Sequence, residues 1–128
     1  MVNSRAKGIR AELALSKFLR EHGYEFAHRG QQHSGVEGKD ILGVPGHHVE
    51  CKWDEALNID KAMAQALRDG KQGERAIVVH RKKLERTVEG KAKFFRQWKV
   101  TLRAEDFFDL VQKVEWLENQ YNAEQEER

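Results

Sequence analysis

Residues 47–53 read His-His-Val-Glu-Cys-Lys-Trp, and this stretch decides how the chain folds. Apolar and polar side chains alternate along it, which is typical of a β-strand with one buried face. Glu50 and Lys52 point to the opposite face as neighbours, a carboxylate beside an ammonium group. Taken alone, a Glu-x-Lys pair more often marks an ordinary ion pair on a solvated strand, because the tripeptide is common. The residues expected to face the core are Val49, Cys51 and Trp53.

The turn before this strand sets which side chains meet across the hairpin. Pro45-Gly46 suits a type II turn, which two-residue hairpin loops disfavour. A two-residue loop would put Asp40 and Glu50 on opposite faces, whereas a three-residue loop over residues 44–46 pairs them on one face. We expect the three-residue loop. Two carboxylates this close repel each other unless a cation lies between them, so the hairpin predicts a site for a divalent metal ion.

Periodicity and stop signals divide the whole chain into three helices and five strands. Gly23 and Gly70 follow the first two helices, and Asn58 is placed to cap the second. The order predicts an α/β fold with a mixed central β-sheet flanked by helices, in a single domain over 1–128 with a frayed acidic tail from about residue 121. The expected helices are 4–22, 59–69 and 104–120, and the expected strands are 24–29, 41–44, 48–53, 76–80 and 94–102, with a basic loop at 85–93.

Glu12 is a polar exception on the apolar face of the first helix. At about 100° per residue, one apolar arc forms around Leu15 and Leu19 and continues to Leu13. Glu12 falls inside this arc. Burying a carboxylate is costly unless a partner or a cation is near, so the position favours a functional role over a glutamate that reaches out to water.

The last predicted helix carries an apolar stripe that we expect to pack on the sheet of its own chain. The stripe consists of Phe107, Leu110, Val111, Val114 and Leu117. Phe108 and Trp116 lie off the stripe, so they are candidates for a contact between subunits, or else for packing on the same sheet.

Composition and charge place broad limits on the class of protein. Hydrophobic residues make up 39% and charged residues 34% of 128 residues, which fits a globular protein with a real core. The formal net charge is only +2, but residues 81–99 hold eight Lys or Arg against two Glu, a segment suited to a phosphate backbone or to an ordinary charged hairpin. A single cysteine, no apolar leader and no membrane-length apolar run predict a cytoplasmic protein without a membrane partner.

Four short motifs, in order and spacing, resemble a known family. They are Lys7-Gly8 with Glu12, Arg29 with Ser34-Gly35, Asp40-Ile41, and Glu50-Cys51-Lys52. Over about residues 5–82 the chain resembles the Holliday junction resolvases of archaeal type and their phage-encoded relatives, within the PD-(D/E)XK nuclease superfamily. The resemblance implies a restriction-endonuclease-like fold and a homodimer that cleaves branched double-stranded DNA, above all four-way junctions, with Mg²⁺ as cofactor and Mn²⁺ able to substitute.

Carried over residue by residue, the resemblance also implies roles within the site. Lys52 would contact the phosphate and the attacking water, and Ser34 and Gln65 are further catalytic candidates, although Gln65 is equally an ordinary solvated helix residue. The implied metal ligands are Asp40, Glu50, the backbone carbonyl of Cys51, and Glu12 directly or through water. The residues expected to contact DNA are Lys7, Arg10, Arg29, Lys39, Arg81, Lys82, Lys83 and Lys91.

The chain departs from the family pattern at two positions. Lys39 stands where the superfamily name has proline, and Leu13 stands where archaeal resolvases often have arginine. Residues 76–108 look more like the phage relatives, so the expected location is the cytoplasm of a bacterium or of a phage-infected host.

Two alternatives to junction resolution stay open. One is a nuclease of the same fold that acts on flaps, forks or DNA ends, and the other is a DNA-binding protein that has lost catalysis. The histidines do not have the spacing of a zinc site. His48 shares the face of Glu50, but we expect it in solvent at a strand end rather than bound to DNA or metal.

Overall fold

The computed structural model describes residues 4–30, 40–54, 56–82 and 97–128. Within these ranges a five-stranded sheet has the order β1-β2-β3-β4-β5, with β3 (His47–Trp53) at its centre. β3 and β4 (Arg75–Arg81) run parallel, and the other neighbouring pairs are antiparallel. The chain is therefore an α/β protein with a mixed open sheet, as expected. The remaining elements are β1 (His28–Arg29), β2 (Ile41–Leu42), β5 (Lys99–Thr101), α1 (Ser4–Glu21), α2 (Ile59–Asp69) and α4 (Ala104–Glu126).

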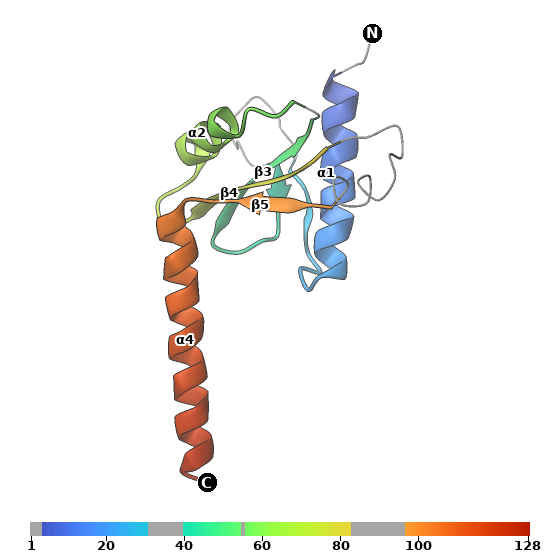
Figure 1. The fold of residues 1–128 in the computed structure, drawn as a ribbon. Coiled ribbons are helices and arrows are strands. Elements are labelled where there is room, and N and C mark those ends of the chain that lie inside the picture. Colours follow the sequence, from blue (N-terminus) through green and yellow to red (C-terminus); the bar gives the residue numbers. More distant parts are fainter. Residues whose placement is uncertain (1–3, 31–39, 55, 83–96) are drawn as a thin grey trace, which may run out of the picture.

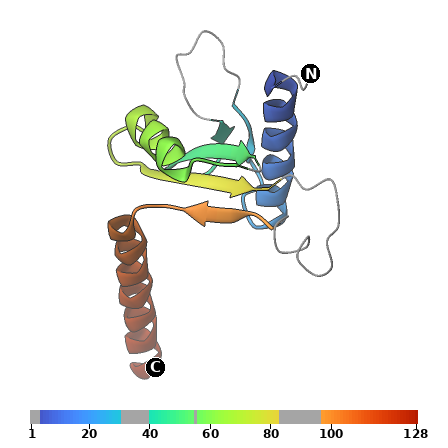
Figure 2. The same ribbon diagram turned by 45° about the horizontal axis from the view of Figure 1, so that its top comes forward.

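Two helices cover opposite faces of the sheet (Figures 1 and 2). Leu15 of α1 shares a buried cluster with Cys51, whereas Ala66 of α2 shares a separate cluster with Val78. Val78 lies beside Glu50 in the parallel register, so α2 covers the face to which Glu50 points. The alternation predicted for β3 is thus confirmed, but both of its faces are covered by helices.

The segments with strong local signals fold as the sequence predicts. α2 begins and ends at the expected residues, with Asn58 Oδ1 accepting a hydrogen bond from the Lys61 N–H at 3.1 Å. The Gly70 N–H donates to the Ala66 carbonyl at 2.9 Å and closes the other end. α1, β3 and β4 each lie within one residue of their expected bounds.

The expected strand over residues 24–29 is wrong for most of its length. Only His28–Arg29 pairs with β2, because the chain after α1 turns back on the helix. The Tyr24 N–H donates to the Leu19 carbonyl at 3.0 Å, and Phe26 is left exposed. β2 is also shorter than expected, since Gly43 follows it with φ +90°. Of the expected strand 94–102, residues 99–101 form β5, whereas 94–96 and the loop 85–93 lie outside the described residues.

α4 differs most from the expectation. It runs on to Glu126, past residue 120, because residues 122–126 are largely Ala, Gln and Glu, with no Gly or Pro to stop it. None of its residues is buried, and Figures 1 and 2 show it extending away from the sheet by itself. The prediction that its apolar stripe packs on the sheet is therefore wrong for most of the stripe. Despite this length, the described part of the chain contains no helix apolar enough to cross a membrane.

Candidate functional site

The hairpin of β2 and β3 brings Asp40 and Glu50 together. Ile41 pairs with Val49, so the same register puts Asp40 opposite Glu50 on one face of the sheet. Continuing this register leaves residues 44–46 as the loop. The predicted three-residue turn and the predicted pairing of the two carboxylates are both confirmed.

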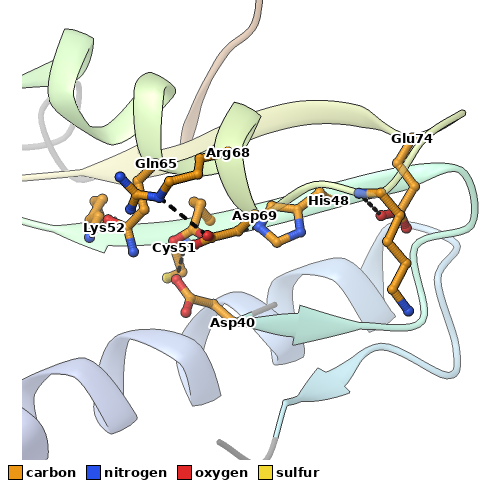
Figure 3. A network of polar contacts seen from close by, with 10 residues as sticks. Asp40, His48, Cys51, Lys52, Gln65, Arg68, Asp69 and Glu74 are labelled. Carbon is orange, nitrogen blue, oxygen red and sulfur yellow. Dashed lines mark hydrogen bonds and ion pairs between the residues drawn. The ribbon is translucent and has the colours of Figure 1, made fainter. Parts of the chain in front are cut away.

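The Asp40 carboxyl group is buried immediately before β2. Its Oδ2 accepts a hydrogen bond from the Cys51 N–H at 2.8 Å, which fixes its direction (Figure 3). Burial, and after it the charge of Glu50, raise the pKa of Asp40 from 3.8 to about 8. Near neutral pH this group therefore keeps a proton unless a cation replaces it. Burial also raises the pKa of the Cys51 thiol, so Cys51 packs as a neutral side chain, as expected.

Glu50 is held by a histidine that sequence reasoning placed in solvent. The side chains of His48 and Glu50 are 0% and 1% exposed, and His48 Nε2 lies 2.9 Å from Glu50 Oε1. The expectation of an exposed His48 is wrong, because the C-terminal end of α2 covers this part of β3 and brings Gly70 against the histidine. Within the described residues His48 Nδ1 has no hydrogen-bond partner, so the ring's polar contact is the one to Glu50.

Lys52 and Gln65 meet where β3 passes under α2. Lys52 Nζ donates to Gln65 Oε1 at 3.5 Å, and Figure 3 shows the two side chains next to each other. Their sequence separation gave no direct sign of this contact, which arises because α2 crosses the face to which Lys52 points. Of the two alternatives for Gln65, the structure therefore favours a place in the site over a solvated helix position.

Glu12 reaches the same region from α1. Its side chain is 14% exposed, which agrees with its predicted place on the protein-facing side of the helix. Leu13, by contrast, is 55% exposed and outside the core, so its assignment to the apolar arc is wrong. Two residues turn a helix by about 200°, which carries Leu13 to the far side of α1 from the buried Leu15.

Arg29 is the direct partner of Glu12. Arg29 Nε donates to Glu12 Oε2 at 2.6 Å. Burial raises the pKa of Glu12, and the nearby charge of Glu50 acts in the same direction, while Arg29 opposes both. The structure thus places Arg29 beside the carboxylates, and its predicted contact with DNA stays a prediction.

Several of the predicted site residues line one cavity. It has a volume of about 420 Å³, and a larger cavity of about 620 Å³ lies between α1 and Trp98. The larger cavity contains none of the three carboxylates predicted as metal ligands. The smaller one is therefore the candidate site, since all three of these carboxylates line it together with Lys52. Its lining includes Lys7, Glu12, Asp40, Glu50, Lys52 and Gln65.

The other predicted site residues are more widely spread. Arg10 and Lys82 are exposed. The Arg81 guanidinium lies 4.1 Å from the ring centre of Trp53 and 4.6 Å from that of Trp98, a stacked arrangement that the sequence did not reveal because it needs β3, β4 and the segment before β5 side by side. The predicted residues outside the described ranges are Ser34, Lys39, Lys83 and Lys91.

The lining of the cavity suits a hard divalent cation. Carboxylate oxygen atoms are the ligands that Mg²⁺ prefers, and burial, followed by the charge of Glu50, raises the pKa of the Asp40 carboxyl group. As placed, Glu50 contacts His48 and Glu12 contacts Arg29, and the described residues contain no group of three acidic, His or Cys side chains close enough to hold an ion. A metal ion bound by all three carboxyl groups would therefore have to compete with His48 for Glu50 and with Arg29 for Glu12.

A scan of protein-family models found no match to this chain, and searches of curated proteins and of solved structures found none either.

Proposed function

We propose that the protein is a Mg²⁺-dependent, structure-selective DNA endonuclease of the PD-(D/E)XK type, and that it resolves four-way DNA junctions. The observation that carries the proposal is the convergence of Lys52 and the three carboxyl groups expected to bind metal on one cavity. Glu12 comes from α1, Asp40 from the start of the hairpin, and Glu50 and Lys52 from β3. A purely structural role explains this poorly, because burying several acidic groups together costs stability that one ion pair does not repay.

The residues of the chain divide the work as follows. Asp40, Glu50 and Glu12 would hold Mg²⁺, which supplies a Lewis acid and a bound water of lowered pKa. His48 orients the Glu50 carboxylate from within the protein. Lys52, steadied by its contact with Gln65, places its positive charge where negative charge develops on the phosphate.

The preference for four-way junctions follows from the resemblance of the motifs to the resolvases. Paired cuts across a junction require two active sites related by a two-fold axis, so the proposed enzyme is a homodimer. The proposed setting is the cytoplasm of a bacterium or of a phage-infected host, where branched DNA of this kind arises.

The test compares two matched variants on a set of DNA substrates. Glu50→Gln should abolish Mg²⁺-dependent cleavage of a synthetic four-way junction while junction binding is retained, because the variant loses a ligand carboxylate and gains no repulsion toward phosphate. Glu115→Gln makes the same chemical change at an exposed position of α4 and should cleave like the wild type. Linear, nicked and flap DNA are incubated with each protein under the same conditions, and their cleavage rates are compared with that of the junction.

Each outcome of this experiment bears on one part of the proposal. Full activity of Glu50→Gln in saturating Mg²⁺ would overturn the assignment of this cavity as the metal site. Faster cleavage of flap DNA than of the junction would overturn the proposed preference for four-way junctions and leave the proposed metal site in place. Junction binding by the wild type with no cleavage in Mg²⁺ or Mn²⁺ would identify a DNA-binding protein without catalysis.

A further inference from the structure

α4 exposes a row of large apolar side chains along a helix that its own domain leaves uncovered. The helix has 23 residues, which corresponds to a length of about 34 Å. None of these residues is buried, and both views show the helix standing clear of the sheet (Figures 1 and 2). The exposed apolar residues are Phe107, Phe108, Val114, Trp116, Leu117 and Tyr121, each between 47% and 62% exposed.

The spacing of these residues is that of a coiled-coil seam. Phe107, Leu110, Val114, Leu117 and Tyr121 follow one another at alternating steps of three and four residues, which is the heptad pattern with apolar a and d positions. Val111, at the adjoining e position, extends this seam on one side. The pattern therefore favours another helix as the partner of α4.

An ion pair between α4 and its own domain lies away from the seam. Arg75 of β4 donates to Asp109 Oδ2 at 2.8 Å. Asp109 occupies the c position of the heptad, which lies on the far side of the helix from the a and d positions. Of the seam, Leu110 is half-buried, whereas Phe107, Val114, Leu117 and Tyr121 are exposed to solvent.

We propose that α4 pairs with α4 of a second copy of this chain in a parallel, two-stranded coiled coil. Leu110 and Leu117 at d with Val114 at the central a position is the combination that favours two parallel strands. In the parallel register Lys113, at a g position, faces Glu118 of the partner subunit at the following e position, so this pair of flanking positions carries opposite charges. A second copy is thus the occupant that both the seam and its charged flank fit.

The coiled coil would be the interface of the homodimer that the proposed function requires. Its role in junction cleavage therefore rests on that proposed function. It also replaces the surface first suggested by the sequence, since Phe108 and Trp116 lie off the seam. Four residues of the stripe that was expected to pack on its own sheet belong to this seam: Phe107, Leu110, Val114 and Leu117.

The test is sedimentation velocity on the full chain, which measures assembly and not cleavage. The wild type should be a dimer at concentrations where Leu117→Glu is a monomer, with a dimer dissociation constant raised at least about tenfold, because a charge cannot be buried in the seam. Trp116→Glu is the matched control: it adds the same charge at a neighbouring side chain of similar exposure, 61% against 59%, and should leave the dimer intact. Circular dichroism checks that both variants stay folded.

A monomeric wild type, or a dimer broken by Trp116→Glu and kept by Leu117→Glu, would overturn the coiled coil. Neither result would touch the metal site, whose test is cleavage by Glu50→Gln. The orientation has its own test: Lys113→Glu should weaken the dimer and the double exchange Lys113→Glu with Glu118→Lys should restore it, because the cross-strand pair is rebuilt. A double variant that dimerises no better than Lys113→Glu alone would overturn the parallel arrangement.

Discussion

Replacing Asp40 by asparagine should prevent a loss of stability that the metal-free wild type undergoes as the pH rises. The side chain of asparagine has nearly the same shape, and its Oδ1 can still accept the hydrogen bond from the Cys51 N–H. What it removes is the ability of this buried group to ionise beside Glu50. The variant therefore isolates the electrostatic cost of the Asp40 carboxylate from its role in the hairpin.

The expected size follows from the pKa of Asp40, which folding raises from 3.8 to about 8. Because the folded protein binds this proton more tightly than the unfolded chain, the stabilisation is complete below the unfolded pKa and is lost as the pH rises toward about 8. At 1.36 kcal/mol per unit, the wild type should lose up to about 4 kcal/mol between about pH 5 and about pH 8. For 128 residues this corresponds to a fall in Tm of up to about 15 °C.

The assay is thermal unfolding in EDTA across this pH range for three proteins. The difference in Tm between Asp40→Asn and the wild type should grow with pH. Asp109→Asn is the control, since Arg75 lowers the pKa of Asp109 and this group is ionised in both the folded and the unfolded protein above about pH 5. Its difference from the wild type should stay flat.

Adding Mg²⁺ should raise the Tm of the wild type most strongly near the upper end of the range and should have little effect on Asp40→Asn, because metal binding displaces the proton. A difference between Asp40→Asn and the wild type that stays constant from about pH 5 to about pH 8 would refute the reasoning. It would mean that Asp40 is ionised throughout and that its charge is already compensated within the protein.

Two further predictions concern the lysine of the site and the hairpin that builds it. Lys52→Ala should lower the single-turnover cleavage rate about 100- to 1000-fold. It should change junction affinity little, because one phosphate contact is a small part of binding. Weakened binding with a normal cleavage rate at saturation would show instead that Lys52 only helps to bind the DNA. Gly43→Ala should destabilise the protein by clearly more than the about 1–2 kcal/mol of a left-handed alanine, since its new Cβ would collide with the Phe26 carbonyl. Gly46→Ala, with φ +76° and open space, is the control for denaturant unfolding, and equal losses would contradict the predicted clash.

Much of the candidate site could be predicted because its signals are local. The alternation of residues 47–53 and the length of the turn at 44–46 depend on backbone geometry over a few residues, and together they place Asp40 opposite Glu50. The cap and stop of α2 are local in the same sense, which is why its bounds were correct. The apolar face of α1 likewise indicated that Glu12 faces the protein.

By itself, then, the sequence determined the hairpin, α2, the class of fold and the carboxylates that could share a site. Only the tertiary structure decided what covers each of them: His48 is buried because the end of α2 lies over it, and Arg29 binds Glu12 because β1 runs beside α1. The apolar periodicity of α4 was predicted correctly, but the surface against which this stripe packs was not. Periodicity records which side chains need covering, whereas the covering surface is set by contacts between segments far apart in the chain, or on another chain.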